Sequence, residues 1–212
     1  MQNLACVISI SMKDYYSKFV PDQFYHIYNR ANGTENLFTE TKNYNFFLER
    51  WNNYLADYLT VWAYCLIPNH FHFLIKVKSE EELTKLLRPE QGAITEMISN
   101  QFRILFISYT KSFNKVYTRN GSLFQKPFKH ILVDSQSYLF ALIHYIHHNP
   151  IHHNFTDTFN DWTYSSYLAL IGNGSTKVDR NSVLDLFGDK NEFMAFHNQM
   201  KDYKKIQHLL IE

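Results

Sequence analysis

The chain has 212 residues, of which 45% are hydrophobic and 19% are charged, and its formal net charge is +1 at pH 7. This composition indicates one globular domain, or one domain with an appendage, and it excludes a disordered chain, a collagen and a coiled coil. Its two cysteines, Cys6 and Cys65, are too few for a disulfide framework. We therefore expect an intracellular protein rather than a small secreted one.

The chain shows no sign of targeting to or across a membrane. The first residues have neither the basic region nor the cleavage site that is typical of a signal peptide, so we expect none. The longest unbroken apolar run, residues 61–67, has seven residues, whereas a membrane-spanning helix needs about 20. We therefore expect no membrane-spanning segment.

Hydrophobic periodicity and turn signals divide the chain into alternating strands and helices. Residues 24–29 alternate as in a strand, and residues 41–58 have helical spacing. Further strands are expected at residues 59–66, 70–77 and 128–133, and further helices at about residues 79–87, 93–113 and 135–148.

Capping residues define the ends of two of these helices. Ser79, followed by Glu82 three positions later, predicts a capping box at a helix start. Asp134 or Ser135 should cap the later helix. We expect Pro150 to end that helix, because the residue before a proline avoids the helical conformation.

The order of the elements, β-α-β-β-α-β and then a helix, predicts an α+β fold of the ferredoxin-like (RRM-like) type. In this fold an antiparallel sheet has helices on one face, and here a further helix and a helical appendage follow. Residues 172–175 (GNGS) read as a flexible joint, and residues 181–212 as two short helices. We therefore expect a main domain at residues 1–171 and an appendage at residues 172–212.

Two histidines in the third expected strand could bind a metal ion. His70 and His72 flank Phe71, and side chains two positions apart on a strand point to the same face of the sheet. Two imidazoles can therefore share one ion, while Phe71 points into the core. The alternative is a solvated or internally satisfied pair. A metal site would in any case need further ligands.

A tyrosine and an asparagine share one face of the last helix of the main domain. Tyr145 and Asn149 lie four positions apart, which places a phenol and an amide side by side. The alternative is that Tyr145 is one core aromatic residue among the fifteen tyrosines of the chain.

The near-neutral net charge conceals a basic segment. Residues 97–133 contain no Asp or Glu, and the cations there are interleaved with aromatic residues. This pattern indicates a surface for single-stranded nucleic acid; the alternative is a solvated helix face and loop. The cations are Arg103, Lys111, Lys115, Arg119, Lys126 and Lys129.

A histidine-rich stretch at residues 144–153 offers a different chemistry, that of a zinc-dependent hydrolase. Such an enzyme needs a carboxylate base close to the metal. No acidic residue occurs at positions 138–155, and the nearest acids in the sequence, Asp134 and Asp157, flank the stretch.

Five segments, taken in order, resemble the single-tyrosine HUH transposases, an insertion-sequence family, and most closely their REP-associated tyrosine transposase branch. Each segment alone is weak, but their order and spacing are specific, and together they span about two-thirds of the chain. They are residues 25–30 (YHIYNR), 64–72 (YCLIPNHFH), 121–129 (GSLFQKPFK), 145–150 (YIHHNP) and 162–167 (WTYSSY).

The resemblance implies an endonuclease and strand transferase that cleaves and rejoins single-stranded DNA next to hairpins, in the bacterial cytoplasm at the nucleoid. It makes Tyr145 the nucleophile that forms a 5′-phosphotyrosine. It makes His70, His72 and Asn149 the ligands of Mg²⁺ or Mn²⁺. It leaves open whether the protein is a monomer or a homodimer.

The expected contacts to DNA follow from the same resemblance and from the basic segment. Asn29 and Arg30 would contact a guide sequence at the foot of the hairpin, and Arg119, Lys126 and Lys129 would contact phosphates. A second interpretation is a catalytically silent hairpin-binding protein derived from a transposase. The joint presence of a nucleophile and a metal-ligand set argues against it.

Overall fold

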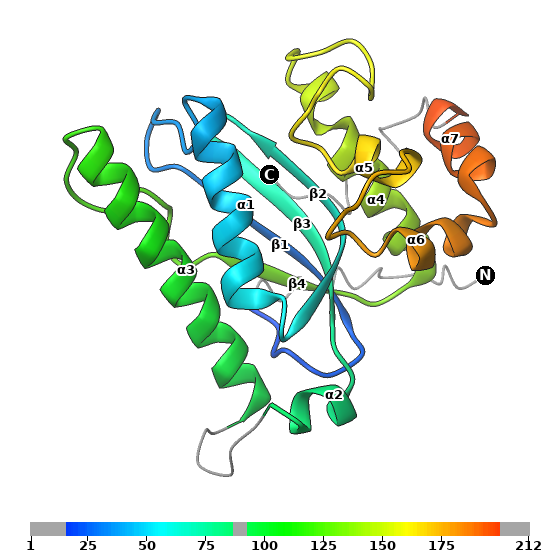
Figure 1. The fold of residues 1–212 in the computed structure, drawn as a ribbon, viewed down its shortest axis with the longest axis horizontal. Coiled ribbons are helices and arrows are strands. Elements are labelled where there is room, and N and C mark those ends of the chain that lie inside the picture. Colours follow the sequence, from blue (N-terminus) through cyan, green and yellow to red (C-terminus); the bar gives the residue numbers. More distant parts are fainter. Residues whose placement is uncertain (1–15, 87–92, 200–212) are drawn as a thin grey trace, which may run out of the picture.

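The computed structural model describes residues 16–86 and 93–199. Their centre is a four-stranded antiparallel sheet in the order β2-β3-β1-β4 (Figure 1). The strands are β1 (Phe24–Arg30), β2 (Leu59–Ile67), β3 (His70–Val77) and β4 (Lys129–Val133). The predicted strands and the α+β, ferredoxin-like arrangement are confirmed. Cys6, the N-terminal segment and residues 200–212 lie outside the described residues.

Two helices, α1 (Thr41–Leu55) and α3 (Ile94–Val116), cover one face of the sheet (Figure 1). Their apolar side chains recur at helical spacing and pack with alternate residues of the strands in a first core. Within this core Trp51 of α1 stacks on Phe73 of β3, with ring centroids 3.6 Å apart. The short helix α2 (Glu80–Thr84) begins with the predicted capping box of Ser79 and Glu82.

The other face of the sheet is covered by α4 (Gln136–His152), which contacts β2 and β3. Three C-terminal helices lie beyond it (Figure 1): α5 (Tyr167–Ile171), α6 (Arg180–Phe187) and α7 (Lys190–Gln199). Together with α4 they form a second core, in which Val183 of α6 and Phe193 of α7 are fully buried. Both faces of the sheet therefore carry helices. Among the described residues, no helix is long and apolar enough to cross a membrane.

Helix α4 begins as predicted, with Ser135 as its cap, but it does not end before Pro150. A proline removes one helical hydrogen bond and crowds the carbonyl group four residues earlier, but here both Asn149 and Pro150 are packed in the interior. Their carbonyl oxygens accept hydrogen bonds from the N–H groups of His153 and Phe155, at 3.0 and 2.9 Å. The last turn is therefore stabilised despite the proline, and the helix runs on to His152.

A chain of buried hydrogen bonds joins α7 to α4. The Nδ1 of His197 donates to the carbonyl oxygen of Phe193, at 2.8 Å, so its Nε2 must accept from Nδ1 of His147, at 2.9 Å. His147 Nε2 then accepts from the hydroxyl of Ser166, at 2.8 Å. The chain is complete only when both imidazoles are neutral.

Acid is expected to destabilise the protein through His197. Burial lowers the pKa of this residue to about 3, from about 6.5 in the unfolded chain. The unfolded state therefore binds more protons, and stability is lost as the pH falls below 6.5. The loss approaches roughly 1 kcal/mol per pH unit once this histidine is protonated in the unfolded chain.

Chemical denaturation at pH values between 4 and 7.5 measures this effect. A His197→Phe variant should show a flatter dependence on pH over the same range, even if it is less stable at pH 7. An equally steep profile in the variant would contradict the assignment.

Candidate active site

The residues that the sequence singles out for catalysis converge between β3 and α4. His70 and His72 point toward α4, whereas Phe71 points into the first core, as predicted. The Oδ1 atom of Asn149 lies 3.1 Å from Nε2 of His70. The ring of Tyr145 meets that of His72 edge-on, with centroids 5.1 Å apart. Strand and helix periodicity thus bring four residues from two distant segments into one site.

His70 is arranged so that its Nε2 atom can bind a cation. Its Nδ1 atom lies 2.9 Å from Oδ1 of Asn69, and its Nε2 atom faces Oδ1 of Asn149. A neutral imidazole has one donor and one acceptor, so donation to Asn69 leaves two acceptors 3.1 Å apart. Neighbouring ligands of an octahedral Mg²⁺, with bonds of about 2.1 Å, are separated by about 3 Å. The pair therefore has the spacing of two ligands of one ion.

His72 presents a second nitrogen that suits a metal ion. Its Nδ1 atom is 2.9 Å from Nε2 of His26, whereas its own Nε2 atom is buried without a hydrogen-bond partner among the described residues. Burial, and then the neighbouring His26 and His70, lower the pKa of His72 well below its usual value. The imidazole is therefore neutral at neutral pH, as a metal ligand must be.

His26 of β1 is a residue that the sequence reasoning did not select. Its contact with Nδ1 of His72 resembles the outer-shell hydrogen bonds that fix the tautomer and orientation of metal-binding histidines. The register of β1 against β3 would have identified it, because Tyr28 lies directly opposite His72. His26, two positions earlier, shares that face.

Replacing His26 by phenylalanine should therefore weaken Mn²⁺ binding by about 10- to 100-fold while retaining an aromatic ring at this position. Calorimetric titration of Mn²⁺ in the absence of DNA measures this directly. Unchanged affinity would show that the hydrogen bond has no part in positioning His72.

The histidine-rich stretch at residues 144–153 does not bring together the ligands of a zinc site. His144 and His147 are buried on the α7 side of α4, and burial lowers the pKa of His144 to about 4. In residues 16–86 and 93–199 no three His, Cys, Asp or Glu side chains are grouped to hold a metal ion. A metal site here must therefore use an amide oxygen beside two imidazoles. The hydrolase interpretation gains no support.

A cavity of about 200 Å³ opens in front of the histidine pair. Tyr145 is 2% exposed and Asn149 is fully buried, and both lie behind the residues that line the cavity. A second tyrosine, Tyr28, does line it. The lining residues are Tyr28, Asn29, Arg30, His70, His72, Gln125, Pro127, Lys129 and His153.

Four of the five residues predicted to contact DNA lie at or next to this cavity. Asn29, Arg30 and Lys129 line it, and Lys126 lines an adjacent hollow. The Nζ atom of Lys129 also lies over the ring of Tyr28, 5.4 Å from its centroid.

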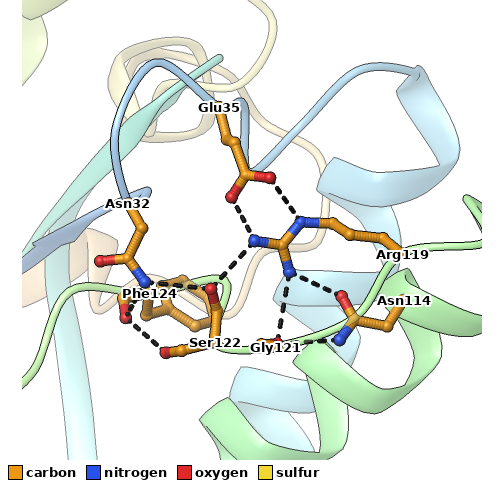
Figure 2. A network of polar contacts seen from close by, with 7 residues as sticks. All are labelled: Asn32, Glu35, Asn114, Arg119, Gly121, Ser122 and Phe124. Atoms are coloured by element: carbon orange, nitrogen blue, oxygen red, sulfur yellow. Dashed lines mark hydrogen bonds and ion pairs between the residues drawn. The ribbon is translucent and has the colours of Figure 1, made fainter.

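Arg119 is placed differently from the other four. Its guanidinium is paired with the carboxylate of Glu35 and donates to Asn114 and to the carbonyl oxygens of Gly121 and Ser122 (Figure 2). The ion pair lowers the pKa of Glu35, and the side chain of Arg119 is only 17% exposed. The structure therefore gives Arg119 a role in fixing the loop that follows α3.

The segment at residues 162–167 is hydrogen-bonded to β2 and to α4 next to the site. The indole N–H of Trp162 donates to the carbonyl oxygen of Leu66, at 2.8 Å. The hydroxyl of Ser166 accepts from the N–H of Tyr64, at 2.8 Å, and also contacts His147 of α4. One serine thus links β2 to the helix that carries Tyr145.

Comparison with known proteins supports the resemblance. No family model matches the chain. A Haemophilus influenzae protein with the provisional name REP-associated tyrosine transposase is 23% identical over an alignment of 138 residues, and the match covers 56% of this chain and 74% of that protein. A solved structure of a REP-associated tyrosine transposase bound to a REP hairpin matches with a TM-score of 0.55 at 14% identity. That match covers 76% of this chain and 86% of the other.

In both sequence and fold the chain is thus similar to REP-associated tyrosine transposases, the resemblance that the five sequence segments predicted.

Proposed function

We propose that this protein is a transposase that cleaves and rejoins single-stranded DNA next to hairpins, with Tyr145 as its nucleophile. One observation carries the proposal. A tyrosine, two histidines and an amide from β3 and α4 meet in one place, with Asn149 at 3.1 Å from His70 and Tyr145 beside His72. A protein that only binds hairpins has no need of this set.

His70, His72 and Asn149 would hold Mg²⁺ or Mn²⁺. The orphaned Nε2 atom of His72 and the 3.1 Å spacing of His70 and Asn149 fit such an ion. When bound, the ion would neutralise charge on the scissile phosphate and polarise it. His26 and Asn69 would keep the two imidazoles in the tautomers that leave their Nε2 atoms facing the ion.

The proposed reaction conserves the energy of the phosphodiester bond. The phenolic oxygen of Tyr145 attacks phosphorus, the bond from phosphorus to the 3′-oxygen breaks, and the phenol loses its proton while the 3′-oxygen gains one. The products are a 5′-phosphotyrosine and a free 3′-OH. A 3′-OH from another strand can reverse the step and join new ends, so ATP is not needed.

Tyr145 must become accessible before it can react, because its ring is 2% exposed behind His72. We propose that DNA binding turns the side chain of Tyr145 out from behind His72 and exposes the phenolic oxygen, while Asn149 stays beside His70. The cations Arg30, Lys126 and Lys129 would position the phosphates in front of it. The hairpin in the matched solved structure supports hairpin DNA as the partner.

A cleavage assay tests the proposal. Labelled single-stranded hairpins from the flanks of the gene are incubated with the protein and Mn²⁺, and parallel reactions contain EDTA or the same DNA as a full duplex. We expect cleavage only of the single-stranded hairpin and only with metal. Tight hairpin binding without cleavage would favour the catalytically silent interpretation, and cleavage with EDTA would exclude the metal-assisted reaction.

A further inference from the structure

The cavity in front of His70 and His72, here called the catalytic cavity, lies next to a larger hollow at α3. This hollow, here called the α3 groove, has a volume of about 640 Å³ and lies between α3 and the loop at residues 121–128. Asn29, Gln125 and Pro127 line both the groove and the catalytic cavity. We propose that the unpaired DNA strand that flanks the scissile phosphate leaves the catalytic cavity along the α3 groove. This inference rests on the proposed function.

The walls of the α3 groove suit unpaired bases. They include Phe106, Phe124 and Phe128, together with Pro127 and the 41% exposed Ile107. Bases without a pairing partner stack on aromatic and apolar side chains with little dependence on their sequence. In a duplex, by contrast, the faces of the bases are already covered. The groove therefore favours a single strand.

The rim of the α3 groove suits phosphates. Arg103, Lys111 and Lys126 line it, and the segment at residues 97–133 contains no acidic residue. In the described part of the chain, Lys111 and Lys126 have no acidic partner. Lys111 also lines a further hollow at the end of α3, together with Lys115. A row of cations thus continues away from the catalytic cavity.

The groove is held open by contacts that need no DNA. The N–H of Gln125 donates to the carbonyl oxygen of Arg30, at 2.9 Å. Asn32 donates to the carbonyl oxygens of Ser122 and Phe124, and the Arg119 network fixes the start of the same loop (Figure 2). A strand that enters the groove therefore meets a loop that is already ordered, which reduces the entropic cost of binding.

The opposite direction, toward the C-terminal helices, is less favourable for DNA. Between residues 157 and 192 the chain has six acidic residues and only three Lys or Arg. Asp185, Asp189 and Glu192 are exposed there. These negative charges repel the phosphates of DNA. Both charge and shape therefore favour a path for the strand along α3.

Two charge-introducing variants test the path. Ile107→Glu places a carboxylate in the groove, and Leu168→Glu places one at a 37% exposed position on α5 as a matched control. The probe is fluorescein-labelled oligo(dT) of about 12 nucleotides, a length within the range of single-strand binding sites, measured by anisotropy without metal. We expect Ile107→Glu to raise Kd about tenfold and Leu168→Glu to change it less than about twofold.

Two further measurements make the test specific. Lys111→Gln should reduce the slope of log K against log salt by about 0.7, the value for one lost phosphate contact on a single strand. A hairpin without an unpaired flank should bind both glutamate variants equally. Equal affinity of the two variants for oligo(dT), or an unchanged salt slope in Lys111→Gln, would overturn the proposed path.

The test is separate from that of the reaction. If the protein cleaves no DNA but Ile107→Glu still selectively loses oligo(dT), the strand path stands and the proposed function fails. If Ile107→Glu binds oligo(dT) and cleaves hairpins like the wild type, the path is wrong and the proposed function stands.

Discussion

Tyr145→Phe is expected to lower the rate of hairpin cleavage by at least about 1000-fold and to leave hairpin affinity within about twofold of the wild type. The substitution removes only the hydroxyl that would form the covalent bond, and no other group can take over its part in the reaction. The ring stays in place between α4 and His72, so its packing is preserved. Single-turnover cleavage and hairpin titration measure the two quantities.

Tyr28→Phe is the matched control, because Tyr28 lines the catalytic cavity and stacks near His72, with centroids 5.6 Å apart. It should retain cleavage within about tenfold of the wild type. The reverse pattern, with Tyr28→Phe inactive and Tyr145→Phe active, would show that Tyr28 of β1 is the nucleophile.

Replacing His70 or His72 by alanine is expected to remove the stimulation of cleavage by Mn²⁺, so that the cleavage rate falls by roughly 1000-fold. A metal ion supplies several kcal/mol of charge stabilisation in phosphoryl chemistry, and about 4 kcal/mol corresponds to roughly 1000-fold in rate. Each variant should also lose Mn²⁺ binding in calorimetry without DNA, because only two ligands would remain.

His152→Ala serves as the control for this pair, since His152 is an exposed histidine at the end of α4. It should bind Mn²⁺ and cleave DNA as the wild type does. Full Mn²⁺ affinity in both His70→Ala and His72→Ala would refute the metal site that we propose.

Much of the fold follows from local patterns in the sequence. The apolar segment at residues 70–77, after the turn signal at residues 67–69, predicted β3 with its observed bounds, and the helical spacing of residues 41–58 predicted the packing of Trp51. The predicted end of α4, before Pro150, was wrong. The rule for residues that precede a proline considers only neighbours in the sequence, whereas Asn149 and Pro150 are stabilised by packing against the rest of the fold.

The catalytic candidates were within reach of the sequence because their spacing is itself geometric. Positions i and i+2 on a strand, and i and i+4 on a helix, share a face. His26 and Gln125 could not be selected from the sequence. His26 reaches the site only through the pairing of β1 with β3, and Gln125 only through its hydrogen bond to the carbonyl oxygen of Arg30. Arg119 was selected for its charge, but its ion pair with Glu35, 84 positions away, could not be predicted from the sequence.

Mapping the covalent DNA adduct tests the central proposal most directly. The protein is trapped on a labelled hairpin with Mn²⁺, denatured, digested with protease and nuclease, and the modified peptide is sequenced by mass spectrometry. The prediction is a nucleotide attached through a 5′-phosphate to Tyr145. Attachment to Tyr28, or efficient cleavage with no adduct on any residue, would contradict a mechanism in which Tyr145 is the nucleophile.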